Sequence, residues 1–141
     1  MKVSILSGWS NPGGSTLHHI ALTNLLNENG FDCAFWGPHL WHLDKCEAKN
    51  FQQEEFNVGE DDILVSHFIQ TNPRMKCRKH ILSCHETNLF PLDKLGTKQY
   101  DAVQFVSDRQ RIWQRVDGVI IPPVIEEVKW EAPGDRDWET N

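Results

Sequence analysis

The first thirty residues, Met1–Gly30, read MKVSILSGWSNPGGSTLHHIALTNLLNENG, and this stretch decides the fold. Residues 2–7 form a short apolar run, and residues 8–15 form a turn that contains three glycines and a proline. Apolar side chains then recur at helical spacing over residues 17–26. A strand, a glycine-rich turn and an amphipathic helix together predict the first βα unit of a parallel sheet.

The turn before this helix is a candidate cradle for a phosphate or diphosphate. Gly13 and Gly14 carry no side chains where the helix begins, and Ser15 or Thr16 is available as its cap. Bare amides and the positive end of the helix dipole can then meet an anion at close range. The alternative is a tight connection that needs glycine conformations, and the sequence leaves both interpretations open.

Length and charge set the domain organisation. The chain has 141 residues, enough for about one domain, and a net charge of −6. Residues 126–141 hold six acidic and two basic side chains. We therefore expect a domain over residues 1–125, followed by an acidic tail or the start of an interdomain linker. No basic footprint indicates a nucleic-acid partner, and no stretch reaches the ~20 apolar residues of a membrane span.

Cysteine spacing and the N-terminal residues predict a cytoplasmic protein. The four cysteines show no paired short spacing, which argues against a zinc ribbon and against a CxxC redox motif. The first residues lack the long apolar core of a signal peptide. Reduced thiols in the cytoplasm are the simplest interpretation of Cys33, Cys46, Cys77 and Cys84.

The rest of the chain alternates apolar runs with turns and short helical patterns. We expect an α/β fold, a Rossmann-like three-layer domain with five to six mostly parallel strands and helices on both faces. Residues 40–56 are ambiguous between a short helix and pairing at a sheet edge. The first helix is expected to start within two residues of Ser15 and to end before Gly30, and a second short helix is expected at 109–115. The strands are expected at 2–7, 31–36, 63–67, 80–84, 102–106 and 119–121.

Ligands of open parallel sheets bind outside the carboxyl ends of the strands. That rule brings together residues that are far apart in the sequence. We expect one concave site that includes the glycine turn, the first turn of the following helix and the strand ends, namely Gly13, Gly14, Ser15, His18, His67, His85, Glu86 and Ser107.

The residues best suited to chemistry are His85 and Glu86, which directly follow a predicted strand. An imidazole there can donate to a substrate hydroxyl or carbonyl, and a carboxylate can accept from a hydroxyl. The alternative is a histidine that ties down a loop by hydrogen bonds. His39 and His42 lack acidic or sulfur partners at metal-ligand spacing, so we expect no metal.

Several common nucleotide motifs are absent. The glycines do not follow GxGxxG, and the second strand ends in Trp36-Gly37-Pro38 where a dinucleotide fold would place an acid. The Gly13-Gly14-Ser15 turn has no P-loop lysine. The first strand ends in Ser7-Gly8, where a phosphoacceptor receiver domain would carry acids.

In this order, the motifs resemble the N-terminal domain of retaining glycosyltransferases with the GT-B fold, the glycogen-synthase-like and sucrose-synthase-like group. The matching motifs are Gly13-Gly14-Ser15 with His18 or His19, Asn29–Cys33 leading to Trp36-Gly37-Pro38, Asp61–His67, Ser83–Thr87, Phe105–Ser107 with Gln110 and Arg111, and Gly118–Val124.

The resemblance implies the acceptor-side half of an enzyme that moves a sugar from a nucleotide-sugar donor to an acceptor, without a metal or other cofactor. It implies that Gly13 and Gly14 approach the donor diphosphate and that His85 contacts the transferred sugar. The family's second domain, which holds the donor, is not recognisable after Pro122-Pro123. We therefore expect a chain that is inactive until that domain is supplied in cis or in trans.

Two other interpretations remain open. One is a non-catalytic Rossmann-like binding or scaffold module, and the other is a different α/β enzyme that takes a nucleotide or phosphate ligand. The basic segment 74–79 is expected to be a solvated face, with contact to a membrane surface or to a substrate phosphate as a minor alternative.

Overall fold

The structure is a computed structural model that describes residues 1–67, 76–85, 100–107, 111–112, 118–122 and 124. Within these residues one helix and seven strands are described with both of their ends. In chain order they are β1 (Lys2–Ser7), α1 (Gly14–Glu28), β2 (Asp32–Gly37), β3 (Ala48–Asn50), β4 (Ile63–His67), β5 (Lys79–Cys84), β6 (Ala102–Phe105) and β7 (Val119–Ile120).

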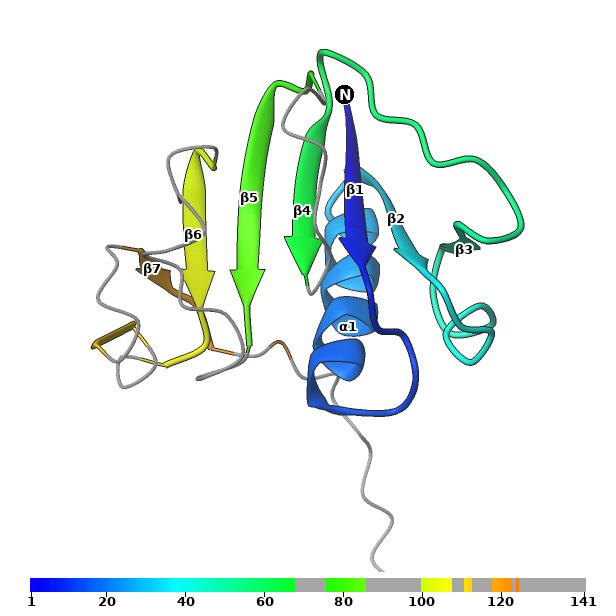
Figure 1. The fold of residues 1–141 in the computed structure, drawn as a ribbon, viewed down its shortest axis with the longest axis horizontal. Coiled ribbons are helices and arrows are strands. Elements are labelled where there is room, and N and C mark those ends of the chain that lie inside the picture. Colours follow the sequence, from blue (N-terminus) through cyan, green and yellow to red (C-terminus); the bar gives the residue numbers. More distant parts are fainter. Residues whose placement is uncertain (68–75, 86–99, 108–110, 113–117, 123, 125–141) are drawn as a thin grey trace, which may run out of the picture.

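All strand pairs are parallel, and the strands lie in the order β3-β2-β1-β4-β5-β6-β7 (Figure 1). The order reverses at β1, where Val3 pairs with Cys33 of β2 on one side and with Ile63 of β4 on the other. This is the doubly wound order of α/β proteins, and the reversal marks the usual place for a ligand. The predicted α/β class with a parallel sheet is confirmed.

The sheet has one strand more than expected because β3 pairs with β2 at the edge. Sheet-edge pairing was one of the two interpretations of residues 40–56. The helix considered for the first part of that segment does not form, since residues 41–45 are turns. The helical pattern expected at 109–115 is described only at residues 111–112, which are helical.

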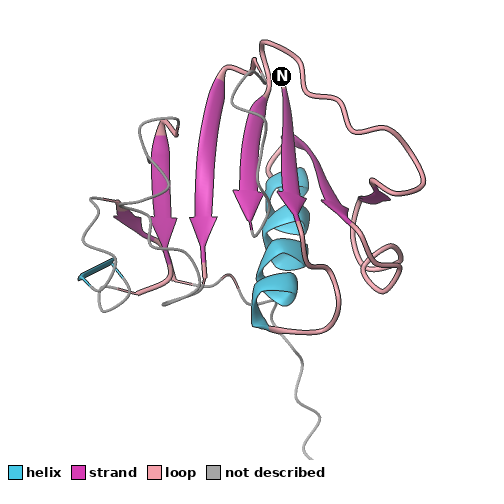
Figure 2. Cartoon of the chain, viewed as in Figure 1, coloured by secondary structure: helices cyan, strands magenta, loops and turns pink. Residues whose placement is uncertain are grey.

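Helix α1 begins at Gly14, one residue from the predicted start, and lies along one face of the sheet (Figure 2). Ile20 of α1 packs with Ile5, Phe35 and Val65 in a buried core on that face. On the opposite face Leu6 and Leu64 pack against Phe56 and other side chains of the connection between β3 and β4. In the described part of the chain, an irregular segment thus takes the place of a helix on that second face.

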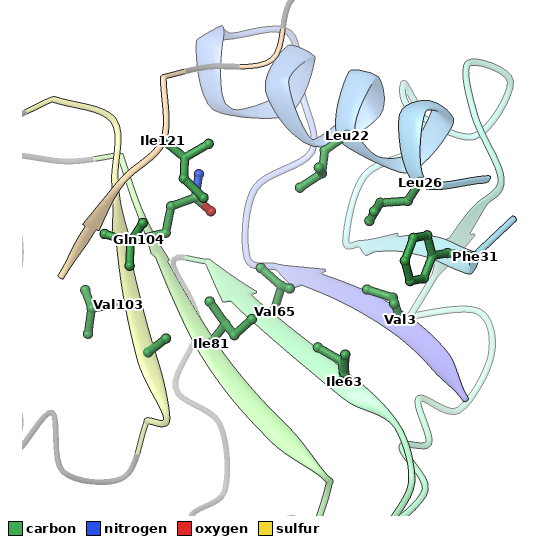
Figure 3. Close-up of a pocket in the computed structure, with 12 residues that line it drawn as sticks. Val3, Leu22, Leu26, Phe31, Ile63, Val65, Ile81, Val103, Gln104 and Ile121 are labelled. Carbon is green, nitrogen blue, oxygen red and sulfur yellow. The ribbon is translucent and has the colours of Figure 1, made fainter. Parts of the chain in front are cut away.

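The α1 face also carries an apolar pocket of about 380 Å³. Figure 3 shows Leu22 and Leu26 pointing from α1 toward Val65 of the sheet, with Ile121 across the pocket. Gln104 adds the one amide to this lining, and its buried Nε2 has no hydrogen-bond partner. The lining residues are Val3, Leu22, Leu26, Phe31, Ile63, Val65, Ile81, Ala102, Val103, Gln104, Val119 and Ile121.

Candidate functional site

The candidate site lies where the strand order reverses, at the carboxyl ends of β1 and β4. Ser7 and His67 are register partners there, and the Gly8 N–H donates to the His67 carbonyl at 2.9 Å. The Ser7 hydroxyl donates to the Trp9 carbonyl at 2.7 Å. Its oxygen therefore accepts from His67 Nδ1, 2.8 Å away, so His67 Nδ1 carries a proton.

The glycine turn joins this strand end to α1, whose first residue lies at the same edge of the sheet (Figure 1). Gly13 is the N-cap residue, and no side chain caps the helix. The expectation that Ser15 or Thr16 caps it is therefore wrong. The first amides of an α-helix have no intrahelical acceptor, so an uncapped start leaves donors for an outside ligand.

The glycines of the turn are not required by backbone conformation. Gly13 has φ 169°, which is extended backbone open to any residue, and among the described glycines only Gly30 lies in the left-handed region, with φ 87°. A Cβ on Gly14 would meet nothing within 4 Å, and one on Gly13 would lie 3.7 Å from Trp9 Nε1. The conformational alternative thus loses its basis at Gly13 and Gly14, and the space beside Gly14 is open to a ligand.

Four histidine rings gather beside the turn. His18 and His19 come from the first turns of α1, His67 from the end of β4, and His85 from the residue after β5. The ring centroids of His18 and His85 lie 4.8 Å apart, and those of His67 and His85 lie 5.1 Å apart. His19 lies 4.9 Å from His67 and 5.1 Å from His85. His18, His19 and His67 are buried, whereas His85 is partly exposed.

Burial keeps the helix histidines neutral. Desolvation, and then the charge of nearby His67, lowers the pKa of His18 from 6.5 to about 4. The pKa of His19 is held well below its usual value by burial first and then by His67, His85 and His18. Neutral rings can each offer one lone pair and one N–H donor, so the cluster suits a polar ligand.

Two ring nitrogens of α1 have no hydrogen-bond partner, His18 Nε2 and His19 Nδ1. The Val124 N–H donates to His18 Nδ1 at 2.8 Å, so the His18 proton sits on Nε2 and is available to an acceptor. Thr16 Oγ1, one turn earlier, is a third buried polar atom without a partner. Buried polar atoms are paired in the great majority of cases, so three unpaired ones within the first two turns of α1 make this part of the helix a candidate ligand site.

Ser83 of β5 links two of the rings. Its Oγ lies 3.3 Å from His19 Nε2 and 3.0 Å from His85 Nε2. Because a hydroxyl can donate once and accept from a second group, Ser83 can fix the orientation of both imidazoles. The His85 ring is thus hydrogen-bonded to another side chain of the site. In the alternative interpretation, its hydrogen bonds would instead anchor a loop.

A second contact holds the outer part of the turn. His39 follows β2, and its Nδ1 accepts the Ser10 N–H at 3.1 Å. The backbone N–H of His39 in turn donates to Ser10 Oγ at 3.0 Å. The Trp9 indole stacks edge-on with the His39 ring at 5.1 Å and remains 43% exposed. Trp9 therefore stands at the rim of the turn, where it can contact a bound molecule.

The structure groups some of the predicted site residues and leaves others apart. Gly13, Gly14, Ser15, His18, His67 and His85 lie in the turn, in the start of α1 and at the adjacent strand ends. Ser107 follows β6, two strands away from β4, and is exposed. Glu86 lies outside the described residues, as do Gln110 and residues 74–75 of the basic segment 74–79.

Sequence reasoning gave too little weight to His19 and missed Ser7, Thr16 and Ser83. His19 and Ser83 are separated by 64 positions, and no local spacing connects them. A signal was present in the helix pattern, since His18, His19 and Thr23 fall among apolar residues on the helix face that packs on the sheet.

Comparison with known proteins adds no family. No protein-family model matches the chain, and no curated protein matches it. In the part of the chain that the structure describes, no helix combines the length and the apolar character needed to cross a bilayer.

Proposed function

We propose that the chain is the acceptor-side N-terminal domain of a GT-B-type glycosyltransferase, which moves a sugar from a nucleotide-sugar donor to an acceptor. One observation carries the proposal: an uncapped helix start and the rings of His18, His67 and His85 meet where the strand order reverses. That position is the usual ligand site of doubly wound sheets.

The donor diphosphate would bind at the glycine turn. The amides of the first α1 turn are directed at it, and the helix dipole favours its negative charge. The bare Cα of Gly14, with open space around it, allows the phosphate oxygens to approach these amides. In the tautomer set by Val124, His18 Nε2–H adds a donor from the buried side.

The transferred sugar would lie against His85. This ring is the partly exposed member of the cluster, at the end of a central strand, and Ser83 holds its Nε2. As the leaving diphosphate gains charge, the turn amides stabilise it, which is the form of electrostatic catalysis that this half of the site can supply. The nucleotide and the remaining diphosphate charge would be held by a second domain, in cis or in trans.

The test is a titration followed by amide NMR shifts, with pyrophosphate, UDP, ADP and GDP as ligands. We expect weak binding, with a Kd of about 1 mM or higher, and the largest shifts at the amides of Gly14, Ser15 and Thr16. Shifts that map elsewhere would contradict the proposed site. Binding of pyrophosphate without any preference for nucleotides would favour the alternative of another phosphate-ligand α/β protein.

A cytoplasmic location belongs to the same proposal. All four cysteines are free thiols, and Cys33 and Cys84 are buried. Free thiols are typical of reducing compartments, where nucleotide sugars also have to be available to such an enzyme.

A further inference from the structure

Three of the clustered histidines also have the arrangement of a metal site. His18, His19 and His85 each offer one ring nitrogen, and these three atoms lie within 4.8 Å of one another. A tetrahedral Zn²⁺ site with Zn–N bonds of ~2.0–2.1 Å separates its nitrogens by roughly 3.3 Å. Side-chain rotation can close a difference of this size, because the three ring centroids already lie 4.8–5.1 Å apart.

We propose that His18, His19 and His85 bind one Zn²⁺ or a similar divalent transition metal. The inference does not depend on the proposed sugar transfer, and a bound metal would engage His18 and His85 in place of the diphosphate and sugar contacts proposed above. It also goes against the expectation from the sequence that no metal is needed, which considered only the local spacing of His39 and His42. Imidazole ligands select Zn²⁺, Co²⁺, Ni²⁺ or Cu²⁺, whereas Mg²⁺ and Ca²⁺ prefer oxygen ligands.

The surroundings of the three rings fit metal binding. The nitrogens His18 Nε2 and His19 Nδ1 are buried and have no partner, so they are the atoms that a metal can take. Ser83 Oγ contacts the opposite nitrogen of His19 and also contacts His85, which is the outer hydrogen bond that orients metal-bound histidines. Both helix rings are neutral at pH 7, as metal ligands must be.

The site would also have an entrance and an open position. His18 and His19 are buried, but His85 is partly exposed at the strand end, which gives an ion a route from solvent. Three protein ligands leave a fourth tetrahedral position for water or a ligand oxygen, which is typical of catalytic zinc and not of closed structural sites.

Metal binding has a consequence for Val124. His18 can ligate through Nε2 only if the ring proton moves to Nδ1, because a neutral imidazole carries a single proton. Nδ1 now accepts the Val124 N–H at 2.8 Å, and two N–H groups cannot face each other at that distance. A bound metal therefore separates Val124 from His18.

The test uses the full chain, freed of metal by a chelator and then titrated with Co²⁺ and Zn²⁺. We expect one ion per chain, visible Co²⁺ absorption bands of a tetrahedral nitrogen site, and faster hydrogen exchange at the Val124 amide. Failure of the chain to bind either ion, or a thiolate-to-cobalt charge-transfer band, would overturn the proposal. These readouts do not involve sugar transfer, so they separate the metal inference from the proposed function.

Matched variants identify the ligands. His18→Asn keeps an acceptor for the Val124 N–H and removes Nε2, whereas His19→Gln keeps a group near Ser83 and removes Nδ1. Each should weaken Zn²⁺ binding by more than the ~10–100-fold that loss of an outer-shell contact costs. His85→Gln, at a partly exposed position, provides a third ligand variant that tolerates substitution.

The control is His42→Gln. His42 is also buried, its Nδ1 also lacks a partner, and its Nε2 contacts the Lys49 carbonyl at 3.0 Å. It lies outside the three-histidine cluster, so His42→Gln should leave the affinity unchanged. Equal weakening by His42→Gln and His18→Asn would show adventitious binding to histidines and would overturn the assignment.

Discussion

Gly14 and Gly37 differ in the space available for a side chain. A Cβ at Gly37 would collide with Ser10 Cβ and would lie 3.1 Å from His42 Cε1, whereas one at Gly14 would meet nothing within 4 Å. Gly37→Ala should therefore lower the free energy of unfolding by about 1–3 kcal/mol, the cost of overpacking. Gly14→Val should change it by less than about 0.5 kcal/mol, as for surface substitutions.

The same pair of variants tests the glycine turn. Gly14→Val should weaken pyrophosphate binding at least about tenfold, or 1.4 kcal/mol, because its side chain projects where the ligand has to approach. Urea denaturation gives the stabilities and the NMR titration gives the affinities. A Gly14→Val protein that is unstable but still binds pyrophosphate normally would mean that the glycine serves the fold and not the ligand.

The buried helix histidines predict a loss of stability in acid for the metal-free protein. The pKa of His18 is about 4 in the folded chain, against its ordinary value of 6.5. The unfolded chain therefore binds more protons between these pH values, and the stability present above pH 6.5 falls as the pH drops toward 4. The slope for His18 is at most about 1.4 kcal/mol per pH unit, and solvent screening makes it smaller.

Urea denaturation at a series of pH values, with chelator present, measures this slope. The variant His18→Asn carries no titrating ring at this position and should show a shallower dependence between pH 6.5 and 4. Stability that is constant across this window in the unmodified chain would contradict the burial of neutral His18 and His19.

A site residue could be predicted from the sequence when the residues that it contacts lie close to it along the chain. Gly13, Gly14 and His18 fall within one βα unit, and the turn chemistry alone marked them. The cluster of His19, Ser83 and His85 requires the tertiary fold, because α1 and the end of β5 come together only in the folded sheet. The tautomer of His18 depends on Val124, 106 positions away, which no local pattern contains.

At the scale of elements, Asn27 ties the end of α1 to the start of β2. Its Oδ1 accepts the Cys33 N–H at 2.8 Å, and its Nδ2 donates to the Cys33 carbonyl at 2.9 Å. Asn27→Ala leaves both backbone groups without this partner and should lower the free energy of unfolding by about 1–3 kcal/mol.

Asn29→Ala is the matched control at the same helix end. The Asn29 side chain is exposed and donates to the Leu25 carbonyl of its own helix at 2.8 Å. Its loss should cost no more than about 0.5 kcal/mol. Thermal or urea unfolding compares the two variants, and equal costs would show that the contact between Asn27 and Cys33 does not couple the elements.

The elements themselves could be predicted where a single period dominates. The alternation of strand, turn and helix over residues 1–37 follows from local apolar spacing, and the observed bounds are close to the expected ones. Residues 51–62 have no regular period, so their role as a cover over Leu6 and Leu64 could not be read from the sequence. Burial by an irregular segment depends on side-chain fit and leaves no periodic signal.

At the scale of the whole molecule, we predict that the 141-residue chain alone transfers no sugar. In the proposed enzyme the donor binds between two domains, and this domain supplies one side of that site. On one side alone, water screens each interaction with the donor and weakens it. Without a second domain the chain also forfeits part of the ~7–11 kcal/mol that orientation of the reactants can contribute.

Incubation of the purified chain with a panel of nucleotide sugars and common acceptors, followed by mass spectrometry, measures transfer. We expect product only after a donor-binding domain is restored in cis or in trans. Clear transfer by the chain alone would mean that either the family or the domain boundary is wrong.

The position of β1 at the centre of the sheet has a consequence for synthesis on the ribosome. Its first neighbour, β2, is complete at Gly37, but its second neighbour, β4, is complete only at His67. At 5–20 residues per second, the nascent chain waits roughly 2–6 s between these events. During that time one edge of β1, a strand that contains Val3 and Ile5, has no partner strand. An open edge of this kind can pair with other chains. Translation speed between codons 37 and 67 therefore sets how long this edge needs protection by a chaperone.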